Sequence, residues 1–397
     1  MGPATPGGRG TKRLPRAPHS VCGGLTGRTG ETRMASGSVI GLDIGSQQIK
    51  AVLLERRRKE WSLLQAGIVP TPLESVQDGV ILDPRRVSDA VRSLMEEAGM
   101  PLVDTVAAVS GSHVLVRSIR VPDMNPAALS RSIRFEAAKH VDQGTTGISV
   151  ETSAVEYEIR GKVGSPPQLD VLLVVAPQPM VNGRVTVMEA AGLEPVAVDV
   201  EAFALLRALE AAQMMPASGQ AVVVCDMGAT YTDVNIVVGN EVAVTRSIPV
   251  GGNALTASLA SVLNVASEEA EEHKRFMDLG PVEGAHAAAL GMETPNMSRQ
   301  VVIPFLDELI RELRRSVIYF QSQAAEAGVA VGVEQVVITG GGAQFAGLVE
   351  YLRDRLGLEI QVLDPLVFQP DSPVGTQWQG HGPEFAVATG LALKEYV

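Results

Sequence analysis

The chain has 397 residues, which is more than one hydrophobic core usually fills, so two domains or lobes are expected. The formal net charge is −12, but residues 1–33 carry six basic side chains against one acid, Glu31, which leaves about −17 on the remainder. A folded part this acidic is a poor nucleic-acid binder, so no nucleic-acid partner is expected. Two cysteines cannot make a disulfide framework, and the longest apolar runs fall short of the ~20 residues that span a bilayer. A reducing, cytoplasmic setting fits these features.

Residues 1–33 are rich in Gly, Pro, Arg and Thr and show no apolar period. Such a segment cannot offset the entropy of ordering it, and without an apolar core it is a poor signal peptide. We expect either a disordered basic tail or an artefact of an upstream start, with Met34 as the true first residue. An arm that binds nucleic acid or touches a membrane is the alternative.

The first half of the chain begins with strands. VIGLDIG, QIKAVLLE and WSLLQAGIV alternate like antiparallel strands, a helix is expected over 83–98, and TVAAVS follows as a short strand. Residues 111–179 then read as strand, helix, strand, strand, which describes a compact inserted subdomain. The chain resumes with a helix over 179–191, a strand in EPVAVDV and a helix over 201–212.

The second half repeats the opening plan. AVVVCDMGATYTDVNIVV is a second hairpin, and SEEAEEHKRF is a charged helix. A long amphipathic helix over 301–323 precedes a strand, a glycine turn and a helix in EQVVITGGGAQFAGLVEYLRDRLG. EFAVATGLALKEY closes the chain as a helix.

The two hairpins carry the same Asp-x-Gly turn. Asp43 and Gly45 in the first answer Asp226 and Gly228 in the second. Each carboxylate stands at a strand end where a hydrated cation could sit, and each glycine lets backbone N–H groups approach an anion. One such turn alone is usually only a turn. The duplication favours a two-sided grip on the phosphates of a nucleotide.

Polar residues around these turns differ between the copies. Lys50 supplies a cation in the first hairpin, whereas Asp233 occupies the matching place in the second, where Thr230 adds a hydroxyl.

Three further motifs have both a functional and an ordinary interpretation. Gly340–Gly342 joins a strand to a helix, where glycine lets a flat or anionic ligand come close or simply permits tight packing. Glu271 and Lys274 lie one helical turn apart and could hold a ribose and an adenine edge, although spacing alone favours a solvated charged face. Glu201 opens a helix, where the helix dipole favours an acid.

In chain order these motifs resemble the five-motif nucleotide cleft of the actin, sugar kinase and heat-shock chaperone superfamily. Within it the chain is similar to the PilM family of actin-like type IV pilus assembly proteins, and more distantly to the FtsA division family. The segments that carry this likeness are AAVSGSHVLVRSIRVPDM with the Phe135–Ala138 helix, VMEAAGLEPVAVDVEAFALLRAL, and ELRRSVIYFQSQ before VVITGGGA.

The resemblance implies an α/β fold of the actin-like, duplicated ribonuclease H-like type: a two-lobed ATPase fold with a 1C subdomain insert. It assigns subdomain 1A to 34–110, 180–218 and the closing helix 386–397, subdomain 1C to 111–179, subdomain 2A to 219–257 and 325–385, and subdomain 2B to 258–324.

The resemblance also implies a site for ATP or ADP with Mg²⁺. Asp43 and Asp226 would organise the hydrated metal, and Glu201, the catalytic position, would orient water or metal. The cofactor-binding residues would be Gly45, Ser46, Gln47, Lys50, Gly228, Ala229 and Thr230 around the phosphates, Glu271 and Lys274 at the nucleoside, and Gly340, Gly341 and Gly342 beside adenine and sugar.

The implied function is nucleotide-dependent assembly with weak or no ATPase activity. A cytoplasmic scaffold on the inner face of the inner membrane would bind the N-terminal segment of PilN near a groove between 1A and 1C. It would link the PilN/PilO complex to the cytoplasmic motor in pilus biogenesis, twitching motility and natural transformation. It would meet the membrane only through partners, and self-association stays open.

Two alternatives remain. A small-metabolite kinase of the same fold needs a carboxylate base in its cleft, for which Asp199 is the obvious candidate, although nothing resembling a sugar site surrounds it. An FtsA-like division filament or tether relies on a C-terminal amphipathic helix after a linker, whereas this chain ends directly after its closing helix.

Overall fold

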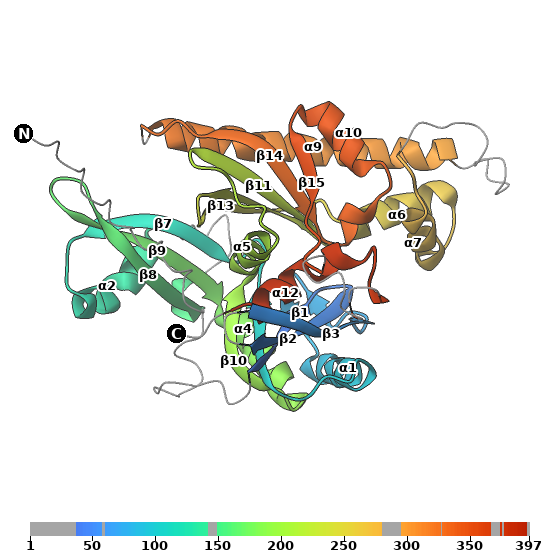
Figure 1. The fold of residues 1–397 in the computed structure, drawn as a ribbon, viewed down its shortest axis with the longest axis horizontal. Coiled ribbons are helices and arrows are strands. Elements are labelled where there is room, and N and C mark those ends of the chain that lie inside the picture. The colour runs from blue at the N-terminus through green and yellow to red at the C-terminus, as the bar shows by residue number, and fades with distance from the viewer. Residues whose placement is uncertain are drawn as a thin grey trace, which may run out of the picture.

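The computed structural model describes residues 37–57, 60–141, 149–279, 295–326, 328–366, 374 and 377–394. The expected tail, residues 1–33, lies outside the described residues. Figure 1 shows two lobes with α5 (Glu201–Ala211) and α12 (Ala386–Ala392) between them and a smaller unit at one side.

The first lobe is built on a five-stranded sheet in the order β10-β6-β1-β2-β3. Strands β1, β2 and β3 form an antiparallel meander, while β6 and β10 run parallel to β1. The strands are β1 (Ser38–Ile44), β2 (Gln48–Arg57), β3 (Glu60–Pro70), β6 (Asp104–Val109) and β10 (Glu194–Val200). Helix α1 (Pro84–Glu97) packs on β3 and on α4 (Gln178–Ala190), which also packs on β10. The side chain of Asp83 caps α1 by accepting from the N–H of Arg86, and Pro84 stands at its first position.

The second lobe repeats this topology strand for strand. Its sheet has the order β13-β12-β11-β14-β15, with an antiparallel meander and two strands parallel to β11. The strands are β11 (Gln220–Met227), β12 (Thr232–Val238), β13 (Glu241–Ile248), β14 (Gly332–Thr339) and β15 (Glu359–Val362), and the helices are α6 (Gly252–Leu263), α7 (Ser267–Arg275), α9 (Pro295–Glu326) and α10 (Leu348–Leu356). Strand β15 was not expected from the sequence, because four residues are too few to show a period.

The inserted unit has its own sheet and core. Strands β7 (Leu115–Pro122), β9 (Gln168–Pro177) and β8 (Ser153–Val163) pair antiparallel in that order, and α2 (Pro126–Ala138) packs beside them. A short 3₁₀ turn, η1 (Val150–Thr152), precedes β8. The insert leaves the first lobe after β6 and returns to it at α4. Arg160 of β8 donates to Glu241 of β13 at 2.7 Å, so the insert also touches the second lobe.

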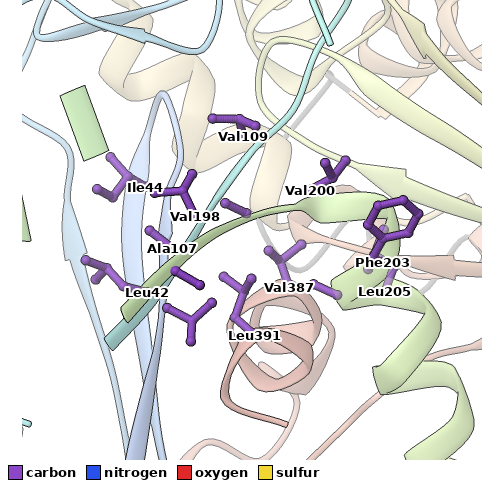
Figure 2. Close-up of a cluster of buried hydrophobic side chains, with 14 of the residues drawn as sticks. Leu42, Ile44, Ala107, Val109, Val198, Val200, Phe203, Leu205, Val387 and Leu391 are labelled. Atoms are coloured by element: carbon purple, nitrogen blue, oxygen red, sulfur yellow. The ribbon is translucent and has the colours of Figure 1, made fainter. Parts of the chain in front are cut away.

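The last helix, α12, closes the first lobe. It packs on β1 and α5 so closely that a Cβ atom at Gly41 would overlap the carbonyl oxygen of Ala388, and one at Gly390 would overlap that of Ala204. Figure 2 shows the core to which β1, β6, β10, α5 and α12 contribute side chains. The boundaries proposed for subdomains 1A, 1C, 2A and 2B stay a prediction.

A two-stranded ladder of β4 (Val76–Gln77) and β5 (Val80–Ile81) lies between β3 and α1 in the chain. Among the described residues, none of the helices combines the length and the apolarity that crossing a membrane requires.

Candidate functional site

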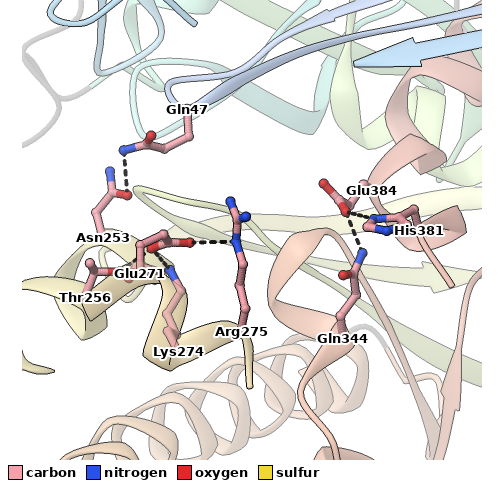
Figure 3. Close-up of polar contacts among 10 residues, drawn as sticks. Gln47, Asn253, Thr256, Glu271, Lys274, Arg275, Gln344, His381 and Glu384 are labelled. Carbon is pink, nitrogen blue, oxygen red and sulfur yellow. Dashed lines mark hydrogen bonds and ion pairs between the residues drawn. The ribbon is translucent and has the colours of Figure 1, made fainter. Parts of the chain in front are cut away.

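The tips of the two hairpins meet. The hydroxyls of Ser46 and Thr230 lie 2.8 Å apart, although 184 positions separate them in the chain. Beside them the amide of Gln47 donates to Asn253 of α6 at 3.0 Å, as Figure 3 shows. The structure therefore brings together the two turns that the sequence paired.

Both turns have the same internal hydrogen bond. The N–H of Gly45 donates to the carbonyl of Gln48 at 3.0 Å, and the N–H of Gly228 donates to that of Tyr231 at 3.0 Å. A Cβ atom would lie 2.9 Å and 2.8 Å, respectively, from these same oxygens, which is why each turn needs glycine. The two glycine N–H groups are thus already used within the turns. Beyond them, the N–H groups at positions 46, 47, 229 and 230 bond to no backbone carbonyl among the described residues, so these would face an anion.

The first hairpin pairs its aspartate with a cation. Asp43 at the end of β1 is 8% exposed and lies opposite Lys50 in the ladder, with 3.1 Å between its Oδ2 and Lys50 Nζ. Burial lowers the pKa of Lys50, but the charges of Asp43 and Asp226 outweigh it, and the net shift is upward. Lys50 is therefore held as a cation among acids.

The second hairpin pairs its aspartate with another acid. Asp226 lies opposite Asp233 in the ladder. Burial and the charge of Asp233 raise the pKa of Asp226 to about 7, with Lys50 acting in the opposite direction. Burial also raises the pKa of Asp233, although the hydroxyl of Ser247 donates to its carboxylate. Among the described residues, no cation forms an ion pair with Asp226 or Asp233, and Lys50 acts on Asp226 only through its charge.

Glu201 adds a further buried acid. It is the first residue of α5, and burial raises the pKa of its carboxyl well above the usual range, reinforced by Asp43, Asp233 and Asp226 in that order. Across the described part of the chain, no three acidic, histidine or cysteine side chains converge closely enough to bind a metal ion directly. The carboxylates fit a hydrated Mg²⁺ instead, which keeps several waters and needs few protein ligands.

Glu271 and Lys274 form a network on α7. Lys274 Nζ lies 2.5 Å from Glu271 Oε2, 2.9 Å from the hydroxyl of Thr256 and 3.3 Å from the carbonyl of Gly252. Burial raises the pKa of Glu271, but the hydrogen bonds from Lys274 and Thr256 outweigh it, and the net shift is downward. Lys274 thus reaches the start of α6 beside the second hairpin, and the pair is more than a solvated face.

The glycine turn after β14 borders Asp226. Gly340 has φ +79°, and a Cβ atom there would overlap Asp226 Oδ1, so both the backbone conformation and the space require glycine. A Cβ atom at Gly342 would press on Met227, whereas one at Gly341 would meet nothing within 4 Å. Gly341 is the position of this turn that leaves room for a ligand.

Several residues of this region had no role assigned from the sequence. The amide of Gln344 donates to Glu384 at 2.7 Å, and His381 lies 2.9 Å from the same oxygen. Figure 3 shows this group facing Arg275 across the opening, where Arg275 Nε lies 3.9 Å from Glu271. Glu384 also contributes to the upward shift of the pKa of Lys50. Only Asp233 had a local signal, because it matches Lys50 in the repeat. The others lie in or beside α7 and two 3₁₀ turns, Gly341–Gln344 and Gly382–Phe385, which the fold brings together.

The structure removes the candidate base of the kinase alternative from the cleft. Asp199 is 0% exposed, and its Oδ2 accepts from Arg207 and from Lys394 at 2.7 Å each, while its Oδ1 accepts from the N–H of Val200. Burial raises the pKa of Asp199, but Lys394 and Arg207 outweigh it and lower it overall. An ion-paired acid of this kind is a poor proton acceptor, and it serves to tie α12 to the first lobe.

In sequence and in structure this chain is similar to pilus assembly proteins. The family model described as type IV pilus assembly protein PilM matches residues 41–396. A solved PilM-PilN type IV pilus biogenesis complex contains a chain that is 28% identical, with a TM-score of 0.74, covering 89% of this chain and 97% of that chain. The ethanolamine utilization protein EutJ from Carboxydothermus hydrogenoformans shares the fold, with 18% identity, a TM-score of 0.52, and 93% of each chain covered.

Cell division proteins are related more distantly. FtsA of Bacillus subtilis (strain 168) is 20% identical over 352 residues, which cover 82% of this chain and 78% of FtsA. FtsA of Enterococcus hirae is 23% identical over 368 residues, 86% of this chain and 81% of that protein. The expected actin-like fold is thereby confirmed. The chain belongs to the PilM family of type IV pilus assembly proteins.

Proposed function

We propose that this chain is an ATP-binding scaffold of the type IV pilus machinery, in which nucleotide occupancy sets the shape of the molecule. The observation that carries the proposal is the meeting of two matched Asp-Gly turns, with Ser46 and Thr230 in contact and N–H groups at both tips. Phosphates held there would accept from both lobes at once and so join them.

In this proposal the charge of each residue decides which part of MgATP it would hold. Lys50 and the N–H groups of the tips would hold the phosphates. Asp43 and Asp226 would hold the waters of Mg²⁺, and Glu201 would orient a water beside them. A bound magnesium ion would supply the positive charge that the Asp226 and Asp233 pair lacks. Glu271, Lys274 and the Gly340–Gly342 turn would border the nucleoside.

Assembly rather than metabolite phosphorylation is the proposed role. Asp199, the one base considered for a kinase, is bound to two cations inside the first lobe. We further propose that ATP hydrolysis by this chain is weak or absent, with Glu201 as the residue nearest to a catalytic role.

Calorimetry with MgATP tests the nucleotide site. The full chain should bind MgATP with micromolar or tighter affinity. Lys50→Met should weaken binding roughly 10- to 100-fold, because it removes one charge-assisted contact. Lys162→Met is the matched control, since Lys162 is an exposed lysine of the insert paired with Asp123, and its affinity should stay unchanged. Absence of binding, or equal binding by both variants, would refute the site.

We also propose that the chain binds the cytoplasmic N-terminal segment of a PilN protein, the partner named in the 28% identical complex. The face of the insert's sheet that packs toward the first lobe offers a fitting residue. Glu156 of β8 lies in the same row as Val174 and Val116, on the sheet face turned away from α2. Burial raises its pKa to about 7, and it has no partner among the described residues. A peptide cation or hydroxyl would satisfy it.

Fluorescence anisotropy with a labelled PilN N-terminal peptide tests this part. Glu156→Gln should weaken peptide binding about 5- to 10-fold, in line with the loss of one charged hydrogen bond. Glu350→Gln, at an exposed position of α10 in the second lobe, is the control. If the labelled peptide does not bind the wild-type chain, the proposal that PilN is a partner is refuted.

The remaining proposals follow from PilN binding. The chain would sit at the cytoplasmic face of the inner membrane through its partner, beside the PilN/PilO complex and the motor. Deleting it should then abolish twitching motility and DNA uptake wherever the pilus serves them, as motility and transformation assays would measure. Self-association of the chain remains a proposal that sedimentation with and without nucleotide would test.

A further inference from the structure

A second contact joins the lobes beside the hairpin tips. The hydroxyl of Tyr231 donates to Asp78 Oδ1 at 2.8 Å, across 153 positions of sequence. Tyr231 follows Thr230 directly, and its carbonyl closes the Gly228 turn. A movement of the second tip, residues 228–230, therefore moves Tyr231 too, because at most three backbone positions separate them.

The Asp78 side of this contact is tied to the first tip as well. Asp78 lies in the turn between β4 and β5 with φ +49°, and the chain leading to this turn passes Thr71. The hydroxyl of Thr71 donates to the carbonyl of Gly45 at 2.8 Å, and its N–H donates to that of Gln47 at 2.9 Å. Residues 71–83, here called the bridge segment, thus contact both hairpins.

The bridge segment also touches both connections of the insert. A Cβ atom at Gly79 would lie 3.2 Å from the carbonyl oxygen of Ser110, so the bridge segment runs close to the point where the chain enters the insert. The carbonyl of Gly79 accepts from Arg184 of α4, the helix by which the chain leaves the insert. Arg184 is 1% exposed and also donates to the carbonyl of Ala108 at the end of β6, at 2.9 Å. These contacts hold the base of the insert from both sides.

We propose that Tyr231 is a positioning residue that links the nucleotide cleft to the insert, so that ATP and the partner peptide tighten each other's binding. The proposal rests on the function proposed above. Phosphates at Thr230 fix the second tip, the tip fixes the Tyr231 hydroxyl, and the hydroxyl fixes Asp78, whose neighbour Gly79 is bonded to Arg184 at the base of the insert. Such coupling is reciprocal, because both ligands then favour the same arrangement.

A binding cycle tests the proposal. Peptide affinity is measured with and without saturating MgATP for the wild-type chain, Tyr231→Phe and the control Tyr319→Phe, which alters an exposed tyrosine of α9. In the wild type and in the control, ATP should tighten peptide binding by roughly 5-fold or more. In Tyr231→Phe each ligand alone should bind within about twofold of the wild type, while the effect of ATP on the peptide disappears. Asp78→Asn keeps an acceptor oxygen and should retain the coupling, whereas Asp78→Ala should lose it.

The outcomes separate the two proposals. If both ligands bind and Tyr231→Phe keeps the full coupling, or the wild type shows none, the role of Tyr231 is refuted and the proposed function stands. If neither ligand binds, the proposed function fails. Hydrogen exchange on the ligand-free protein then still decides the role of Tyr231: residues 110–122 and 178–184 should exchange faster in Tyr231→Phe than in Tyr319→Phe. Equal exchange would overturn it.

Discussion

The two hairpins share one backbone and differ in their charges. Each has a glycine turn closed by the same hydrogen bond, and each sets its aspartate opposite a residue of the returning strand. In the first that residue is Lys50, which forms an ion pair with Asp43; in the second it is Asp233, which repels Asp226. The two hairpins thus have the same turn geometry, but the aspartate of the first is neutralised by Lys50, whereas the two acids of the second would be neutralised by a bound cation.

A second difference lies two residues before each aspartate. Gly41 of β1 leaves room for the backbone of α12, whereas its counterpart Val224 of β11 is a buried side chain in the core. The closing helix therefore seals only the first lobe. Where the sheets meet other elements, the two copies have become specialised.

The largest expected effect comes from making the first copy like the second at this position. Gly41→Val would drive a side chain into the carbonyl of Ala388, where backbone faces backbone and neither can yield. Overpacking of this kind should cost about 3 kcal/mol or more of unfolding free energy, measured by urea denaturation. Gly161→Val is the control, because a Cβ atom at Gly161 meets nothing within 4 Å. Equal stability of the two variants would mean that α12 does not pack on β1 as described.

The next largest effect is on stability, where replacing Asp226 and replacing Asp43 should act in opposite directions near neutral pH. The pKa of Asp226 is raised from 3.8 to about 7, so its contribution to stability is full below pH 4 and is lost as the pH rises through about 7. Without nucleotide and magnesium, Asp226→Asn should therefore flatten the fall in stability between pH 5 and 8, by roughly 3 kcal/mol at most. Glu201 and Asp233 keep part of the slope, since their pKa values are raised too.

Asp43→Asn is the matched variant in the first hairpin. It leaves the buried Lys50 without its ion pair and should lower stability by about 1–3 kcal/mol near pH 7. Thermal melts of both variants from pH 5 to 8 would measure the contrast. If Asp226→Asn lowered stability at pH 8, as Asp43→Asn should, the proposed difference between the copies would be wrong.

The smallest effect concerns the contact that the copies share. The hydrogen bond between Ser46 and Thr230 should contribute about 1 kcal/mol, since both hydroxyls are half-buried. A double-mutant cycle of Ser46→Ala with Thr230→Ala, read by urea denaturation of the nucleotide-free chain, isolates this pair. A coupling energy of zero would mean that the tips do not touch in solution.

The elements of the fold were largely readable from local pattern. Asp83 with Pro84 marks a helix start, and the alternation around Asp43 and Asp226 marks hairpins, because strand period and cap chemistry depend on near neighbours. Strand β15 escaped because it is short. Its place is set by pairing with β14 rather than by its own residues.

The candidate site likewise contains residues that the sequence indicates and residues that only the fold brings together. Gln344, Glu384, Asn253 and Arg275 stand in or beside segments whose secondary structure is predicted but whose pattern gives these four side chains no role, and only the fold brings them around the cleft. Asp199 shows the converse. This carboxylate was the obvious candidate for a kinase base, but Arg207 and Lys394, the latter 195 positions away, are ion-paired with it.

The sequence by itself determined that two Asp-Gly hairpins exist, that their aspartates and glycines correspond, and that Lys50 in one corresponds to Asp233 in the other. These are properties of short segments, whose turns and strand pairing are decided by neighbouring residues. Only the tertiary structure decided that the tips touch, that Asp226 carries a raised pKa, and that Tyr231 bonds to Asp78 of the other lobe. Burial and contact between distant segments produce these properties, and neither is encoded at any one position.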